Sequence, residues 1–280
     1  MPSPSGSFDE QAPLYDARAG LPAAAGADVA RAIVEGAGTR PGDLVVELGA
    51  GTGEIGAHFA RLAVRYVGLD RSAPMLEVFR GKMTESSPSL VVADCDRPWP
   101  LRDGAASVVF ASRVVHLLDA DHVAREARRV CRPAGCLIVG RVMRDDDGAK
   151  ARLRRRRRAL LANAGLAPRQ GEEGTRRVVE RCRAAGGTSL GPQVVAEWTG
   201  ATTPAAVIAG WERLSRMGSI EVDPATRAAI LDDLRGWAGS EFGDLAHPQP
   251  FRERYVVEVV RFPSRAATTG FGEGPCTTRF

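Results

Sequence analysis

The stretch VVELGAGTGEIGAHFA, residues 45–60, places three glycines within five residues, between an apolar run and a helical pattern. Glycines at these positions, Gly49, Gly51 and Gly53, let a ligand approach the backbone closely because no Cβ stands in the way. The helix start that follows offers N–H groups without partners in the helix itself. The stretch therefore predicts a strand, a ligand-binding loop and a helix in direct succession, which is a unit of an α/β fold.

The spacing of the three glycines limits which ligand this loop can hold. Dinucleotide-binding loops follow the pattern G-x-G-x-x-G, whereas this loop reads G-x-G-x-G, and Gly56 comes two residues too late to replace the third glycine. Glu47, just before the first glycine, is foreign to a loop that holds a pyrophosphate. The pattern argues against a nicotinamide cofactor, and a nicotinamide-binding or non-catalytic Rossmann-like protein stays an alternative.

Strand and helix patterns alternate through the first half of the chain. Apolar strand-like runs occupy residues 43–49, 65–70, 89–94, 106–112 and 136–143. Helical patterns occupy residues 27–38, 53–63, 73–83 and 120–132. Such alternation predicts a parallel sheet with right-handed crossovers.

The chain divides into five segments. Residues 14–143 carry the alternating core, and residues 251–263 supply a last strand that should rejoin the sheet. Residues 144–250 are mostly helical in pattern and are expected to form an insertion near the edge where open α/β sheets bind ligands. Residues 1–13 and 264–280 have the composition of flexible ends.

Composition excludes several classes of function. A net charge of +4 over 280 residues is too small to indicate nucleic acid by itself. No apolar run approaches the roughly 20 residues of a membrane span, and the N-terminus lacks the features of a signal peptide. The five cysteines form no C-x-x-C pair and no metal-type cluster with the four histidines. We expect a cytoplasmic monomer or homodimer with reduced thiols, no metal and no membrane association.

Carboxylates stand at the ends of the first three predicted strands. Asp70 ends the second strand, where it could accept both hydroxyls of a ribose, and Asp94 ends the third, where it could accept from an adenine amino group. Glu47 ends the first strand and could face an ammonium. These groups suit a ligand with an amine, a ribose and an adenine but no pyrophosphate. S-adenosylmethionine, which also carries a positive sulfonium, fits that description.

The same segments resemble the class I S-adenosylmethionine-dependent methyltransferases. VVELGAGTG, VGLDRSAPML and VVADCDRPWPL are similar to the first three motifs of that family, and ARRVCRPAGCLIVG to its fifth-strand region, with Ala134 replacing a glycine. The resemblance is closest to the group of quinone-biosynthesis and other small-molecule methyltransferases, and it covers about residues 15–143. It implies a Rossmann-like, seven-stranded, mostly parallel sheet with an antiparallel last strand and helices on both faces. Residues 144–250 would then cover the substrate.

The resemblance also implies which residues hold S-adenosyl-L-methionine and its product S-adenosyl-L-homocysteine. They lie in the motif regions and at the end of the fourth strand: Glu47, Gly49, Ala50, Gly51, Thr52, Gly53, Asp70, Arg71, Met75, Asp94, Cys95, Ala111 and Ser112. Tyr15 and Arg18, in LYDARAG, resemble an N-terminal segment that closes over the cofactor in this family. An ordinary surface position is the alternative for both.

The methyl acceptor is less constrained by the sequence. The fourth strand ends in FASRVVHLLD, without the Asp/Asn-Pro-Pro-aromatic turn expected of enzymes that methylate nucleic-acid amines. His116 could take a proton from a hydroxyl or an acidic carbon, although a structural or substrate-contact role is the plainer alternative. Positioning of the acceptor in line with the sulfonium could suffice. We expect methyl transfer to an oxygen or carbon, less readily a nitrogen, of a small molecule.

The run KARLRRRRRALL, residues 150–161, contains five consecutive arginines. At about 100° per residue, five neighbours cannot share one helix face. Arg157 projects closest to the apolar side of the helix and Arg156 flanks it, so one of them is expected to enter the cleft and bind a carboxylate or phosphate. A solvated helix face is the alternative. Nucleic acid is not the expected partner, and an RNA or protein methyltransferase of the same fold stays the second hypothesis.

Overall fold

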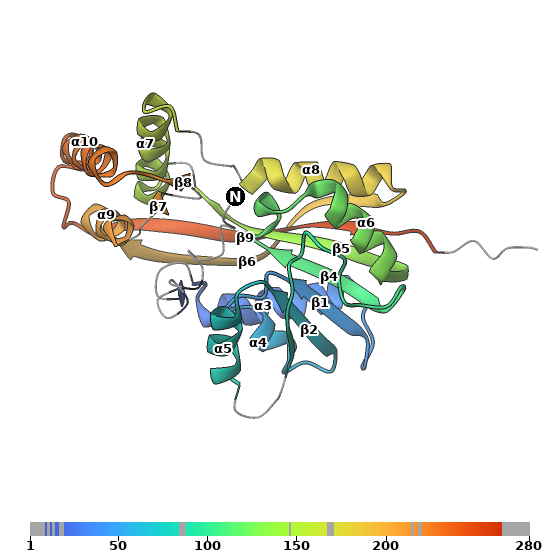
Figure 1. Cartoon of the computed structure of the whole chain (residues 1–280). Helices are drawn as coiled ribbons and strands as arrows, with labels where there is room; N and C mark the ends of the chain where they lie inside the picture. Colours follow the sequence, from blue (N-terminus) through green and yellow to red (C-terminus); the bar gives the residue numbers. More distant parts are fainter. Residues whose placement is uncertain are drawn as a thin grey trace, which may run out of the picture.

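A computed structural model of the chain describes residues 20–83, 88–145, 147–166, 171–213, 216–217 and 220–264, together with Asp9, Ala12, Tyr15 and Asp16. Its centre is a seven-stranded sheet with helices on both faces, and a separate group of helices stands beyond one end of the sheet (Figure 1).

The sheet has the strand order β3-β2-β1-β4-β5-β9-β6. Its strands are β1 (Leu44–Leu48), β2 (Arg65–Asp70), β3 (Ser89–Val92), β4 (Ala106–Ser112), β5 (Cys131–Arg144), β6 (Thr188–Thr202) and β9 (Gln249–Arg261). Strands β1 to β5 pair in parallel, and β9 runs antiparallel to both β5 and β6. The predicted mostly parallel sheet with an antiparallel last strand is confirmed. The strand order reverses between β1 and β4, the place where such sheets bind ligands.

The two faces of the sheet carry separate hydrophobic clusters, because successive side chains of a strand point to opposite faces. Val45 packs on the face covered by α3 (Ala23–Gly36), α4 (Gly56–Phe59) and α5 (Ala73–Gly81). Val46 packs on the face covered by α6 (Ala120–Val130) and α8 (Gly171–Ala184), next to the short 3₁₀ helix η2 (Val115–Leu117). Burial on both faces explains why the central strands are continuously apolar.

A third hydrophobic cluster lies apart from the sheet and forms the cap. It joins α7 (Ala149–Asn163), α9 (Pro204–Glu212), the hairpin of β7 (Arg216–Met217) and β8 (Ile220–Glu221), and α10 (Pro224–Phe242). Leu153 of α7 and Trp211 of α9 pack there with Leu234 of α10. The cap stands beyond the ends of β6 and β9 (Figure 1).

The structure divides residues 144–250, for which the composition predicts one mostly helical insertion. Helix α8 packs on α6, and β6 is the edge strand of the sheet, so both belong to the core. Helical pattern alone did not separate α8 from the cap helices, because what distinguishes them is which segments their apolar residues contact. The cap is therefore formed by α7 and by residues 204–242, with α8 and β6 between them in the chain.

Candidate functional site

The glycine loop follows β1 at the switch point of the sheet. Gly51 and Gly53 have φ values of 53° and 78°, in the left-handed region that favours glycine. A Cβ on Gly53 would also lie 2.2 Å from the ring of Phe79, so both conformation and space require glycine there. The backbone N–H of Gly51 donates to Oδ2 of Asp70 at 2.8 Å. The loop and the carboxylate at the end of β2 are thus joined directly.

Asp70 is held by two backbone donors. Its Oδ1 accepts from the N–H of Ser72 at 2.9 Å, and its Oδ2 accepts from Gly51. Ser72 in turn caps α5, since its Oγ accepts from the N–H of the buried Met75 at 3.3 Å. Burial raises the pKa of Asp70, while these hydrogen bonds act against that rise. Each carboxylate oxygen can accept more than one hydrogen bond, so Asp70 retains capacity for a diol. The neighbouring Arg71 is exposed.

Glu47 forms a buried pair with a tyrosine. Its side chain is 3% exposed, and the hydroxyl of Tyr66 donates to its Oε2 at 2.6 Å. Gly56 makes room for the pair, because a Cβ there would lie 2.3 Å from the Tyr66 hydroxyl. Burial raises the pKa of Glu47 to about 8, against the effect of the Tyr66 hydrogen bond. The carboxyl group is therefore mostly protonated at neutral pH, until a cation approaches it.

A pocket opens between the glycine loop and the end of β4. Its walls are Tyr15, Glu47, Gly49, Ala50, Gly51, Thr52, Glu54, Ile55, Ser112 and Arg113. Its empty volume of about 320 Å³ lies at the small end of the range for ligand pockets. A ligand as long as S-adenosylmethionine would extend beyond it along the loop.

Arg113 and Glu54 form an ion pair in this pocket that no sequence motif indicated. Arg113 follows β4 with a φ of 56°, an unusual conformation for a residue with a Cβ. Burial alone would lower its pKa, but Tyr15 and Glu54 outweigh that effect and raise it. Glu54 also accepts from the backbone N–H of Leu21. The one available signal was a charged residue directly after a buried strand, at the same edge as Asp70.

Residues near the N-terminus contact the loop. Asp16 accepts from the hydroxyl of Thr52 and pairs with Lys82, whose ammonium also donates to the carbonyl of Thr52 at 2.7 Å. Tyr15 lines the pocket. Arg18, named with it in the sequence analysis, lies outside the described residues.

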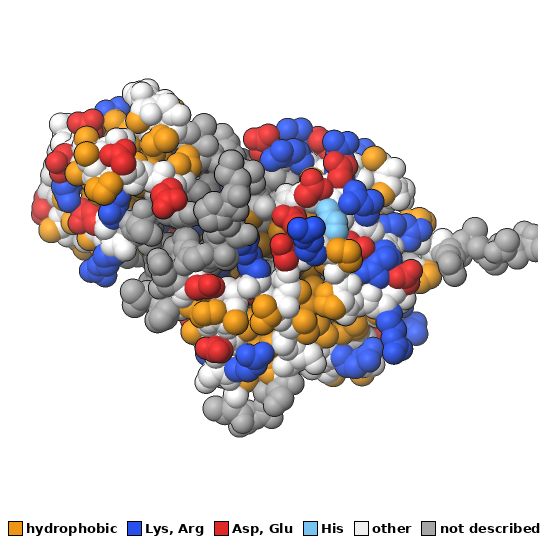
Figure 2. Space-filling model, in the orientation of Figure 1, with side chains coloured by type: hydrophobic (Ala, Val, Ile, Leu, Met, Phe, Trp, Pro, Cys, Tyr) orange, Lys and Arg blue, Asp and Glu red, His pale blue; other side chains and the backbone are white. Residues whose placement is uncertain are grey.

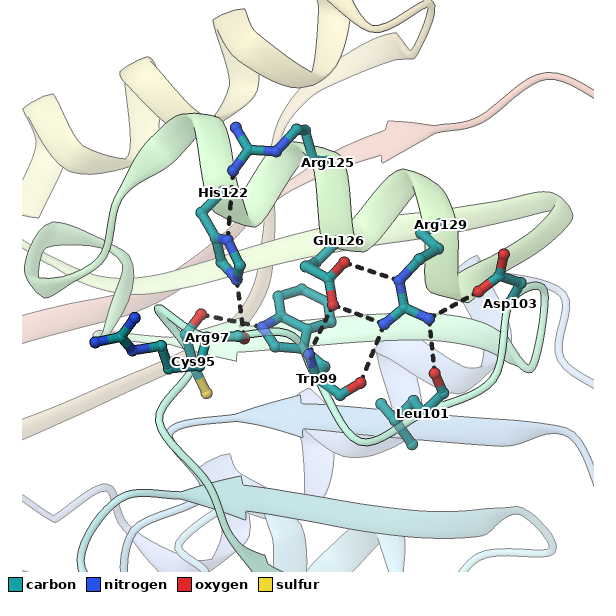
Figure 3. A network of polar contacts seen from close by, with 9 residues as sticks. All are labelled: Cys95, Arg97, Trp99, Leu101, Asp103, His122, Arg125, Glu126 and Arg129. Atoms are coloured by element: carbon teal, nitrogen blue, oxygen red, sulfur yellow. Dashed lines mark hydrogen bonds and ion pairs between the residues drawn. The ribbon is translucent and has the colours of Figure 1, made fainter.

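A polar network fixes the loop after β3 on helix α6 (Figure 3). Glu126 accepts from the backbone N–H of Trp99 at 2.7 Å and binds Arg129 through both carboxylate oxygens, at 2.8 and 2.6 Å. Arg129 also donates to the carbonyls of Trp99 and Leu101 and to Asp103, at 3.0, 2.7 and 2.8 Å. Hydrogen bonds from Arg129 lower the pKa of Glu126, so the pair stays charged at neutral pH. The loop is thus rigidly attached.

The anchored loop presents the residues of the third motif. The indole N–H of Trp99 donates to the carbonyl of Cys95 at 3.0 Å. Cys95 is buried, and burial raises its thiol pKa to about 12, so it acts as a small apolar side chain. Asp94 is exposed, and its Oδ1 accepts from the N–H of Asp96 at 3.0 Å.

The end of β4 is tied to β9 by a second buried tyrosine. The hydroxyl of Tyr255 donates to Oγ of Ser112 at 2.6 Å, next to the buried Ala111. Gly140 allows this approach, since a Cβ there would lie 2.2 Å from the Tyr255 hydroxyl. The Tyr255 hydroxyl therefore orients the Ser112 side chain in the wall of the pocket.

The three residues predicted for the acceptor lie in η2 and in α7 of the cap. His116 lies in η2 against α8, where a Cβ on Gly174 would be 2.6 Å from its Cα. The guanidinium carbons of Arg157 and Arg156 lie 4.1 and 5.9 Å from the ring centroids of Trp211 and Trp237 in the cap. None of the three is among the described residues that line the pocket.

Comparison with known proteins identifies the core. Residues 46–139 match a family described as "Methyltransferase domain". This part of the chain carries the sequence pattern of a methyltransferase domain. An uncharacterized 37.1 kDa protein in transposon Tn4556 of Streptomyces fradiae is 37% identical over 106 residues, which cover 36% of this chain and 30% of that protein. The chain therefore matches less than a third of that relative's length.

Solved structures share the fold over most of the chain. A proposed Type II methyltransferase from Anaeromyxobacter dehalogenans has a TM-score of 0.58 at 18% identity, with 87% of this chain and 98% of that chain covered. The [4+2]-cyclase SpnF has a TM-score of 0.52 at 18% identity, with 85% and 82% covered. The fold is that of class I S-adenosylmethionine-dependent methyltransferases, and the second protein shows that it also serves another reaction.

A metal site and a membrane span can each be assessed within the residues that the structure describes. In that part of the chain, no group of three or more His, Cys, Asp or Glu side chains is placed to hold a metal ion. No described helix combines the length and the apolar character that crossing a membrane requires.

Proposed function

We propose that this protein is an S-adenosylmethionine-dependent methyltransferase that methylates an oxygen or carbon atom of a small molecule. The observation that carries the proposal is the direct bond between the glycine loop and Asp70 at the switch point of a methyltransferase domain. The carboxylate of Asp70, which could accept hydrogen bonds from a ribose diol, lies beside backbone N–H groups of the loop. The glycine spacing of that loop does not suit a pyrophosphate.

The described residues offer a partner for each part of the cofactor. Asp70 would bind the ribose, and Asp94 with Cys95 would border the adenine on the loop fixed by Glu126. Glu47, a buried residue of the pocket wall, would meet the ammonium group. An approaching ammonium favours the charged carboxylate, so it would lower the raised pKa of Glu47 and form a charge-assisted hydrogen bond there.

Positioning is the main catalytic contribution that we assign to this chain. The cofactor supplies an electrophilic methyl group on its sulfonium, and the protein must hold the acceptor atom in line with it and away from water. The cap, which has its own hydrophobic cluster, would close that side of the site. A proton must leave an acceptor hydroxyl or carbon during the reaction, and His116 remains our candidate to receive it.

An RNA methyltransferase of the same fold is less well supported. On the face shown in Figure 2, basic and acidic side chains are interspersed over the cap and over α6 and α8. Of the arginines in the run, Arg156 and Arg157 lie over tryptophan rings of the cap. A nucleic-acid surface would instead require a continuous basic field.

Substitution of Asp70 tests the proposal. Asp70→Ala should weaken S-adenosylhomocysteine by roughly 1.5–3 kcal/mol, because charge-assisted hydrogen bonds to the ribose are lost. Asp28→Ala, which removes an exposed carboxylate from α3, is the matched control and should bind normally. Unchanged calorimetric affinity in a folded Asp70→Ala protein would remove the ribose assignment.

A further inference from the structure

Charged side chains gather where β5 ends, β9 begins and the cap starts. Arg144 is the last residue of β5, Glu253 lies early in β9, and Lys150 and Arg154 lie in the first turns of α7. Because β5 is parallel to β1, this junction belongs to the same edge of the sheet as the glycine loop.

One buried carboxylate serves several cations at this junction. Glu253 is 6% exposed, and its Oε1 lies 2.9 Å from Nε of Arg144 and 3.5 Å from Nζ of Lys150. Its Oε2 accepts from the indole N–H of Trp198 at 3.2 Å. Both carboxylate oxygens therefore already have partners.

Arg154 adds a third cation without adding an anion. Among the described residues, no carboxylate lies within ion-pair distance of its guanidinium. Two nearby carboxylates are already engaged, since Asp145 pairs with Arg254 and Glu197 pairs with Arg252. The junction thus holds three cations against the single charge of Glu253.

This excess of positive charge is unfavourable in the protein alone. Burial lowers the pKa of Arg144 and of Lys150, and Glu253 only partly opposes it. Arg154 is exposed to solvent on one side. Partial desolvation by the neighbouring protein lowers its pKa, and the positive charge of Arg144 lowers it further. Arg113, in the wall of the proposed cofactor pocket, adds to the repulsion on Arg144. A cationic cluster that is both accessible and short of counter-charge favours an anion.

We propose that Arg144, Lys150 and Arg154 form a subsite for a carboxylate or phosphate group of the methyl acceptor, which makes the acceptor an anionic small molecule. This assignment rests on the proposed function, because it places the acceptor beyond the cofactor pocket. Guanidinium groups bind both kinds of anion in a bidentate manner, and Lys150 contributes a point charge. Glu253 holds Arg144 and Lys150 in place while leaving the cluster positive.

Trp198 provides a local reporter for the test. Its indole N–H is bonded to Glu253, so the indole resonance in ¹⁵N-labelled protein should respond to an anion at the junction. Inorganic phosphate and acetate would be titrated separately at constant ionic strength maintained with chloride. The indole of Trp99, which donates to the carbonyl of Cys95 inside the core, is the internal control. We expect a saturable shift of Trp198 and none of Trp99, and the tighter anion identifies the preferred group.

Variants establish which side chains bind the anion. Arg154→Gln should weaken the tighter anion about tenfold, the loss of one charge-assisted interaction. Arg155→Gln removes the same charge about 100° around the helix and should leave affinity unchanged. Lys150→Gln should weaken binding similarly and replaces Arg154→Gln if that variant does not fold. An unmoved Trp198 resonance, or equal affinity in Arg154→Gln and Arg155→Gln, overturns the subsite.

A separate titration with S-adenosylhomocysteine distinguishes the two proposals. Binding of S-adenosylhomocysteine without a specific anion response removes the subsite and leaves the proposed function. A specific anion response without S-adenosylhomocysteine binding removes the proposed function and leaves an anion site of another purpose.

Discussion

Replacement of Glu47 by glutamine should stabilise the folded protein at neutral pH and weaken its binding of the cofactor. Glu47 is buried against the hydroxyl of Tyr66 and carries a pKa raised from 4.5 to about 8. Glutamine keeps the size of the side chain and still offers an oxygen to Tyr66, but it never ionises. Glu47→Gln therefore removes the free-energy cost of burying a carboxylate while preserving the hydrogen bond.

The sign and size of the effect follow from the pKa of Glu47. A folded-state pKa above the unfolded value means that stability is fully present below pH 4.5 and is lost as pH rises to about 8. At pH 7 the loss covers about 2.5 pH units, which corresponds to roughly 3 kcal/mol. Relative to pH 4.5, wild type should thus lose about that much stability at pH 7, and Glu47→Gln should not.

Urea unfolding at pH 5, 6, 7 and 8 measures this difference directly. We expect the stability of Glu47→Gln relative to wild type to grow across that range. S-adenosylhomocysteine affinity should show the opposite preference: wild type gains affinity as Glu47 ionises, and the variant binds more weakly at pH 8. Parallel stability profiles for the two proteins would refute the buried, protonated carboxyl, and equal affinity at pH 8 would refute its contact with the ammonium.

Two further results are expected. Hydrogen exchange at Tyr15 and Asp16 should slow when S-adenosylhomocysteine is added, because these residues lie on the glycine loop and the pocket; protection restricted to residues 49–53 would show that they form no lid. Once an acceptor is known, Arg154→Gln should raise its KM with little effect on cofactor affinity, whereas Arg157→Met should not, because Arg157 lies over Trp211 in the cap. His116→Ala should lower kcat. An unchanged KM in Arg154→Gln would exclude the acceptor contact, and an unchanged kcat in His116→Ala would exclude the base.

The glycine loop and the strand ends beside it could be predicted because their positions depend on local chain order. Glycine spacing, the strand ends at Asp70 and Asp94, and the apolar runs between them are all visible in the sequence, and a parallel sheet brings strand ends together. The direct bond from Gly51 to Asp70 is a consequence of that order.

The remaining residues depend on contacts between distant segments. Arg113 pairs with Glu54 after a turn at the end of β4 in which Arg113 adopts a positive φ. No residue type in the sequence indicates that backbone conformation. Glu253 meets Arg144 and Lys150 through antiparallel pairing of β5 with β9, more than 100 residues apart in the chain. The apolar side of α7 correctly identified Arg156 and Arg157 as unusual, but tryptophans of the cap cover them, and periodicity within one helix cannot reveal that.

The most direct test of the account is the choice of cofactor by the wild-type protein. Calorimetric titrations with S-adenosylhomocysteine and with NADH compare the two ligands that a glycine loop in a Rossmann-like fold can hold. The account predicts micromolar or tighter binding of S-adenosylhomocysteine and none of NADH. Binding of NADH, or no binding of S-adenosylhomocysteine to the folded protein, would contradict it.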